Sequence, residues 1–152
     1  MTTRVRTILA RLARGALATV LGTVAAGLSI ASIEKLGHLL FPPPAGLKPG
    51  DLDAIAAHVA TAPVGSLLLV LLGWLCGAFL GGLLAARIAG RRPRLYAGVI
   101  AALVLLGAIT NFAMIAHPAW FIALSIVALP LAGFAAATLA DPVGRRGLTS
   151  PV

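Results

Sequence analysis

The chain has 152 residues, of which 60% are hydrophobic and 11% are charged, a composition that excludes an ordinary soluble domain. Its formal net charge of +8 would suggest a nucleic-acid partner in a soluble protein. Here the basic residues flank long apolar runs, without the basic and aromatic soluble face that nucleic acids require, so no nucleic-acid partner is expected.

Four apolar stretches follow one another along the chain, at residues 15–41, 64–86, 95–116 and 119–140. Each supplies the roughly 20 apolar residues that a membrane-spanning helix needs. The sequence therefore predicts an all-α transmembrane fold, a four-helix membrane bundle in which residues 1–152 form a single membrane domain. No catalytic signature accompanies these stretches, and no soluble catalytic domain is expected.

The arginines flank the stretches on one side of the expected membrane. They precede the first stretch, separate the second from the third, and follow the fourth: Arg4, Arg6, Arg11, Arg14, Arg87, Arg91, Arg92, Arg94, Arg145 and Arg146. Only Lys35 and Lys48 fall on the other side. Because positive charge near span ends stays cytoplasmic, both termini are expected inside.

The same arginines bear on location and on lipid contacts. Arg87, Arg91, Arg92 and Arg94 fill the inner loop and are expected to set the topology and to attract anionic lipid head groups. High alanine and arginine with little lysine is typical of a GC-rich bacterial genome. The expected location is the bacterial inner membrane.

The first stretch allows two interpretations. The arginines before an apolar run, with Ser29-Ile30-Ala31 as a small-residue cleavage site, resemble a signal peptide. The run continues to Phe41, however, which exceeds the apolar region of a signal peptide and favours an uncleaved span. Small residues recur in it at spacing four, at Gly15, Thr19, Thr23, Gly27 and Ala31.

The outer loop at residues 42–63 begins with Pro42-Pro43-Pro44, which cannot continue a helix. Asp51 is a favourable N-cap, and Leu52, Ile55, Ala56 and Val59 follow it at helical spacing. This pattern predicts a short amphipathic helix lying in the outer interface. His58 lies elsewhere on the helical wheel and is expected to be solvated.

The second stretch carries the clearest helix-packing pattern. Gly73, Gly77 and Gly81 recur every fourth residue, with Gly82 on an adjacent row. Such glycines let another helix backbone approach closely. We expect them, together with Gly27 of the first stretch, to pack spans one and two inside the bundle; an interface between copies of the chain is the alternative.

The remaining stretches show turn and interface signals. His117-Pro118 predicts a tight outer turn, with Pro118 as the first helical residue of the fourth span. Trp120 is expected in the outer aromatic belt, and Pro130 should kink the last helix. The lone Cys76 lies mid-span and allows no disulfide within the chain.

Four polar residues fall in one layer near the outer boundary when the rise along each helix is counted: Glu34, His38, Asn111 and His117. Two imidazoles and a carboxylate would suit a transition metal or a proton-coupled ligand. In the simpler interpretation Glu34 pairs with Lys35 or His38 in a wet interface, while His117 caps the last span. The sequence does not decide whether the four residues face one another.

Two motifs carry a resemblance that covers most of the chain. The first is E-x-x-x-H at Glu34 and His38, followed by P-P-P-x-G-L from Pro42 to Leu47. The second is H-P-x-W from His117 to Trp120. Together they resemble a group of small four-span bacterial inner-membrane proteins of unassigned function, in which a proline would stand where this chain has Ala116. The resemblance implies the topology and no reaction.

Three classes of function follow from these patterns. The first is a non-enzymatic membrane protein acting by association, as an accessory or assembly subunit or a self-associating scaffold, with the lipid bilayer and another membrane protein or itself as partners. The alternative is a small transporter or a metal- or ion-binding protein that uses the outer Glu/His layer. A membrane enzyme is not expected, since few titratable groups are present, and no motif predicts a cofactor.

Overall fold

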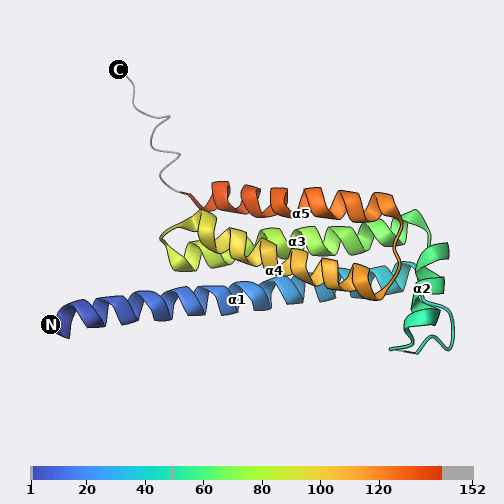
Figure 1. Ribbon diagram of the computed structural model, residues 1–152, viewed down its shortest axis with the longest axis horizontal. Coiled ribbons are helices and arrows are strands. Elements are labelled where there is room, and N and C mark those ends of the chain that lie inside the picture. The colour runs from blue at the N-terminus through green and yellow to red at the C-terminus, as the bar shows by residue number, and fades with distance from the viewer. Residues whose placement is uncertain (1, 49, 142–152) are drawn as a thin grey trace, which may run out of the picture.

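The computed structural model describes residues 2–48 and 50–141, and this part of the chain forms five helices (Figure 1). They are α1 Thr2–Leu40, α2 Leu52–Thr61, α3 Val64–Ala89, α4 Pro93–Met114 and α5 Ala119–Ala140. The expected all-helical fold is confirmed. All except α2 are long and apolar enough to cross a membrane, as predicted. Arg145 and Arg146 lie outside the described residues.

α1 is longer than the predicted span, since it begins at Thr2 rather than near residue 15 and runs for 39 residues. A helix of that length measures about 58 Å, against a hydrocarbon thickness of about 30 Å. Arginine, leucine and alanine are good helix formers, so the segment before Gly15 stays helical although it is not apolar. It projects past the ends of α3, α4 and α5 (Figure 1).

α3 is the central helix of the bundle, because it packs against α1, α4 and α5. α4 and α5 also pack against each other, whereas α1 and α4 touch much less. α2 lies across one end of the bundle (Figure 1), which we call the α2 end. The opposite end, where the loop between α3 and α4 lies, is called the arginine end.

Glycines allow α1 and α3 to approach closely. A Cβ atom added to Gly77 would lie 2.7 Å from Cγ1 of Ile30, and one added to Gly81 would lie 2.5 Å from the carbonyl oxygen of Gly22. Gly73 also faces α1, where its nearest neighbour is Ile33. These three glycines therefore lie inside the bundle. Of the two alternatives that the sequence allowed, they pack the first two spans together rather than forming an interface between copies of the chain.

The small-residue face of α1 differs from the expected one. The residues that pack are Ala18, Gly22 and Ala26, which are buried, whereas Gly27 has nothing within 4 Å of an added Cβ atom. The expectation that Gly27 packs against the second span is therefore wrong. Two rows of small residues run along α1 about 100° apart, and the position of α3 selects one of them.

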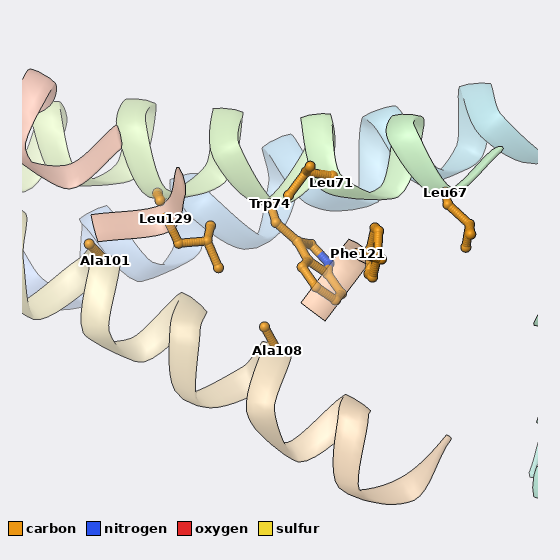
Figure 2. Packing of buried hydrophobic residues seen from close by; sticks show 8 residues of the cluster. Leu67, Leu71, Trp74, Ala101, Ala108, Phe121 and Leu129 are labelled. Atoms are coloured by element: carbon orange, nitrogen blue, oxygen red, sulfur yellow. The ribbon is translucent and has the colours of Figure 1, made fainter. Parts of the chain in front are cut away.

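Gly82 faces the other side of α3, where an added Cβ atom would lie 3.4 Å from Ala136 of α5 and 3.4 Å from Ala97 of α4. Toward the α2 end the buried side chains are larger than those around Gly82. The main buried cluster there combines aromatic, leucine and alanine residues from three helices (Figure 2): Leu67, Leu71, Trp74, Ala78, Ala101, Ala108, Phe121 and Leu129.

At the arginine end, α1 caps α3. The Arg14 Nε–H donates a hydrogen bond of 2.6 Å to the carbonyl oxygen of Ile88, in the last turn of α3. Gly90 then ends α3 with a left-handed φ of 67°, and a Cβ atom there would lie 3.1 Å from Nη2 of Arg14. A cation at a helix C-terminus satisfies carbonyl groups and opposes the negative end of the helix dipole.

The loops at the α2 end agree with most sequence expectations. The predicted N-cap is confirmed, because the backbone N–H of Ala54 donates to Oδ1 of Asp51 at 3.1 Å. Pro118 is not the first helical residue, as had been expected, but precedes α5 as its N-cap, and its carbonyl oxygen accepts from the Phe121 N–H at 3.0 Å. α5 continues without interruption through Pro130.

Candidate functional site

A cavity of about 710 Å³ lies at the α2 end, bounded by α1, α3 and α4 and covered by α2. Its volume falls within the range of small-molecule sites, about 300–1,000 Å³. Its lining includes all four polar residues that the sequence placed in one layer: Glu34, His38, Asn111 and His117. The structure thus brings together residues whose lateral positions the sequence left open.

The cavity has a polar end and an apolar end. Lys48 and His58 join the four predicted residues at the polar end, close to α2. Toward the middle of the bundle the lining becomes apolar, with Ile30, Leu103 and Val104 among its residues. Thr23 and Glu34 both line the cavity and lie 11 residues apart on α1, or about 16 Å, close to the thickness of one leaflet's hydrocarbon, about 15 Å.

The apolar end opens sideways between α1 and α4. Thr23 and Gly27 of α1, and Leu103 and Gly107 of α4, line the cavity and are also exposed on the bundle surface. A Cβ atom added to Gly27 or to Gly107 would meet nothing within 4 Å. The cavity is therefore open on the side of the bundle between α1 and α4.

The polar residues of the cavity are not satisfied by one another. Within residues 2–48 and 50–141, the side chains of Glu34, His38, Lys48, His58 and Asn111 make no hydrogen bond or ion pair. The pairing of Glu34 with a neighbouring base, which the simpler interpretation required, does not occur there. Their donors and acceptors are available to water or to a bound molecule.

His117 is held in one orientation. Its Nδ1 lies 2.7 Å from the carbonyl oxygen of Ile115, and because a carbonyl only accepts, Nδ1 carries the proton. The ring stacks on Phe121 with 5.4 Å between centroids and meets the edge of Phe112 at 5.3 Å. In the neutral form Nε2 is therefore a fixed acceptor, and in the protonated form it is a donor.

Trp74 also lines the cavity. The residue is only 7% exposed, and its indole lies 5.6 Å from the Phe121 ring, centroid to centroid (Figure 2). Its Nε1–H has no hydrogen-bond partner in the described part of the chain. Every fully buried side-chain nitrogen or oxygen in that part does have a partner, so this N–H is not fully buried. The N–H therefore reaches open space, and Trp74 lines the cavity.

The site does not resemble a preformed metal centre. Within the described residues, no group of three His, Cys, Asp or Glu side chains lies close enough to hold a metal ion. Protein zinc sites use three or four such ligands.

Sequence reasoning missed three residues of the cavity. Lys48 is in an irregular loop and His58 was assigned to a solvated face, but α2 lies over the cavity, and both residues line it. Trp74 was taken for an ordinary bundle residue. The signal that was available is the scarcity of polar side chains in a chain that is 11% charged, which makes each one a candidate.

The arginines of the inner loop do not contribute to the cavity. Arg87, Arg91, Arg92 and Arg94 are exposed at the arginine end, at the opposite end of the bundle from α2. Arg94 borders a smaller groove between α4 and α5. Their positions are compatible with contacts to lipid head groups.

Comparison of the chain with protein-family models, with curated proteins and with solved structures gave no match. The chemistry of the cavity and the surfaces of the bundle are therefore the basis for the function proposed below.

Proposed function

We propose that this chain is a non-enzymatic multi-pass membrane protein that binds a small amphipathic molecule of the bilayer in the cavity at the α2 end. The carrying observation is a single cavity with unpaired polar side chains at one end and an apolar, laterally open region at the other. A ligand with a polar head and an apolar chain satisfies both ends, whereas a purely polar or a purely apolar ligand leaves one end unmatched.

The arginine distribution supports an orientation for this site. With the arginine end in the cytoplasm, both chain ends are inside and the α2 end faces outward. α2 then lies in the outer interface, and the cavity spans the outer leaflet of the bacterial inner membrane. Anionic lipids of the inner leaflet meet the arginine end. A small transporter would also need the binding step described here.

Replacing Gly107 with leucine tests the proposal. The added side chain enters the open space of the cavity, and overpacking typically costs about 1–3 kcal/mol, or roughly 5- to 150-fold in affinity. We expect native mass spectrometry of the protein, extracted from its membrane in mild detergent, to show a bound small molecule that the Gly107→Leu variant has largely lost.

Gly98→Leu is the matched control. Gly98 is also in α4 and also has nothing within 4 Å of an added Cβ atom, but it borders the smaller groove and not the cavity. This variant should retain the bound molecule. Equal occupancy in both variants, or no bound molecule in the unchanged protein, would contradict the proposal.

A second function, association with another membrane protein, is favoured by the N-terminal extension of α1. The extension passes the end of α3, to which Arg14 is hydrogen-bonded, and so leaves the apolar layer of the bundle. Val5, Leu9 and Leu12 are 50–65% exposed on one side of it, and Arg4 and Arg11 lie on the adjacent side, roughly 100° or a little more around the helix. A partner helix with apolar and acidic residues would cover both.

Mass spectrometry of proteins that co-purify with the tagged chain from its native membrane tests the second function. We expect a membrane protein in stoichiometric amount, lost in Leu9→Asp because a carboxylate would be buried in the apolar contact. Ala10→Asp introduces the same charge about 100° away on the helix and should keep the partner. Recovery of the chain alone would remove this function and leave the cavity.

A further inference from the structure

We infer that the ligand of the cavity is a single-chain lipid with a phosphate head group and a hydroxyl close to it. The inference rests on the proposed function and specifies its ligand. It is carried by the charges at the polar end, by their order in depth and by the size of the cavity.

The polar end favours an anionic head. Its charged or protonatable side chains are Lys48, His38, His58 and His117 on the basic side and only Glu34 on the acidic side. An ammonium group and imidazoles donate hydrogen bonds to phosphate oxygens, and bonds to a charged acceptor are the stronger ones. These side chains come from α1, from α2 and from the loops that follow α1 and α4, so they converge on one head group from several directions.

The polar side chains lie at different depths in the cavity, and this assigns the phosphate and the hydroxyl of the ligand to different levels. Lys48 and His58 belong to the loop and helix that cover the cavity, whereas Glu34 lies one turn deeper along α1 than His38. A phosphate fits the outer level. At the deeper level the carboxylate of Glu34 can accept a hydrogen bond, so a donor group of the ligand suits this position. A hydroxyl next to the phosphate supplies that donor and separates the two negative charges.

The size of the cavity favours one chain. At about 30 Å³ for each water-sized group, a cavity of about 710 Å³ holds roughly 24 such groups. This matches a phosphate, a short linker and one alkyl chain, so a second chain would have to stay outside the cavity. The apolar region is also one leaflet long, so the chain can lie parallel to α1 and α4.

The two tryptophans of the chain provide the readout. Trp74 lines the cavity, whereas Trp120 is 41% exposed on the bundle surface. The protein is placed in nanodiscs, and a lipid with a brominated chain, which quenches indole fluorescence on contact, is added in small mole fractions. A Trp120→Phe background reports the cavity through Trp74. A Trp74→Phe background reports the bulk bilayer through Trp120.

Three probes with the same brominated chain separate the parts of the inference: lysophosphatidic acid, monoacylglycerol and two-chain phosphatidic acid. We expect saturable quenching of Trp74 by lysophosphatidic acid and at least about tenfold weaker quenching by monoacylglycerol, since a hydrogen bond to a charged group contributes about 1.5–3 kcal/mol. Phosphatidic acid should quench Trp74 no more than the bulk bilayer does.

Variants then test the head group. Lys48→Gln should weaken lysophosphatidic acid binding about tenfold. Lys35→Gln, an exposed position of α1 outside the cavity, should not change it. Glu34→Gln should tighten binding, since the amide oxygen still accepts from the hydroxyl and the repulsion of phosphate is gone.

The outcomes distinguish a wrong choice of lipid from a failure of the proposed function, which is binding of an amphipathic molecule in the cavity. If monoacylglycerol bound as tightly as lysophosphatidic acid, the anionic head group would be wrong, although the cavity would still bind an amphipathic molecule. The same would follow if lysophosphatidic acid bound more weakly to Glu34→Gln and more tightly to Lys48→Gln. Saturable binding of phosphatidic acid would overturn the single chain. If no probe quenches Trp74 more than the Trp74→Phe background predicts for bulk lipid, the proposed function fails as well.

Discussion

Replacing Gly81 with leucine is expected to separate α1 from α3. Even a Cβ atom at this position would lie 2.5 Å from the carbonyl oxygen of Gly22 and 2.8 Å from Cβ of Ala26, so backbone and not only side chains would have to move. Overpacking of a well-packed core costs about 1–3 kcal/mol, and a whole leucine between two backbones should reach the upper end of that range or exceed it. Unfolding by a graded increase of sodium dodecyl sulfate in mild detergent measures the loss.

Gly27→Leu is the control for this prediction, because it adds the same side chain to α1 where no atom lies within 4 Å. It should leave the stability within about 0.5 kcal/mol of the unchanged protein. If Gly27→Leu destabilised the bundle as strongly as Gly81→Leu, the α1 face assigned here would be incorrect. Gly77→Leu should resemble Gly81→Leu, since an added Cβ atom there lies 2.7 Å from Ile30.

Phe121→Ala is expected to have the second large effect. Phe121 is completely buried, and its ring contacts those of Trp74, Phe112, His117 and Trp120, with centroids 5.4–6.0 Å apart. Removing a buried phenylalanine ring typically costs about 3–5 kcal/mol. The variant should also lose ligand binding, because the ring on which His117 stacks and against which Trp74 packs is gone.

Trp120→Ala removes a larger ring from the adjacent position and serves as the comparison. Trp120 is 41% exposed, and its one ring contact among the described residues is a T-shaped one with Phe121. Its loss should cost about 1 kcal/mol or less and leave ligand binding unchanged. Similar losses of stability in the two variants would show that the aromatic cluster does not depend on the central ring.

The spans could be predicted from the sequence because hydropathy and helix length act locally. The four apolar stretches correspond to α1, α3, α4 and α5 within a few residues at most ends. The exception is the start of α1, where the arginines between Arg4 and Arg14 hid a continuous helix. Hydropathy identifies segments that are apolar enough to lie in a membrane, whereas helix propensity is also high for charged residues such as arginine, so a helix can extend beyond the apolar segment.

The packing face of α1 could not be predicted in the same way. The rows Thr19–Thr23–Gly27 and Ala18–Gly22–Ala26 both consist of small residues at spacing four. They differ by one residue in register, and only the partner helix distinguishes them. Gly81 and Gly77 of α3 provide that partner, which is 50 residues or so away in sequence.

The candidate site was predicted in one dimension only. Counting the rise along two helices placed Glu34 and Asn111 near one level. In the structure both residues line the same cavity. Their lateral approach depends on the weak contact between α1 and α4, a property of the whole bundle. Lys48 and His58 depend on the path of an irregular loop, for which periodicity carries no information.

The glycine contact between α1 and α3 joins two helices that are synthesised at different times. At about 5–20 residues per second, Gly81 leaves the ribosome several seconds after Gly22. During that interval the small-residue face of α1 has no partner from its own chain, and any other helix with small residues at spacing four can occupy it. Slower translation of the segment between the two helices would lengthen this interval, and we expect it to increase pairing of α1 with other helices.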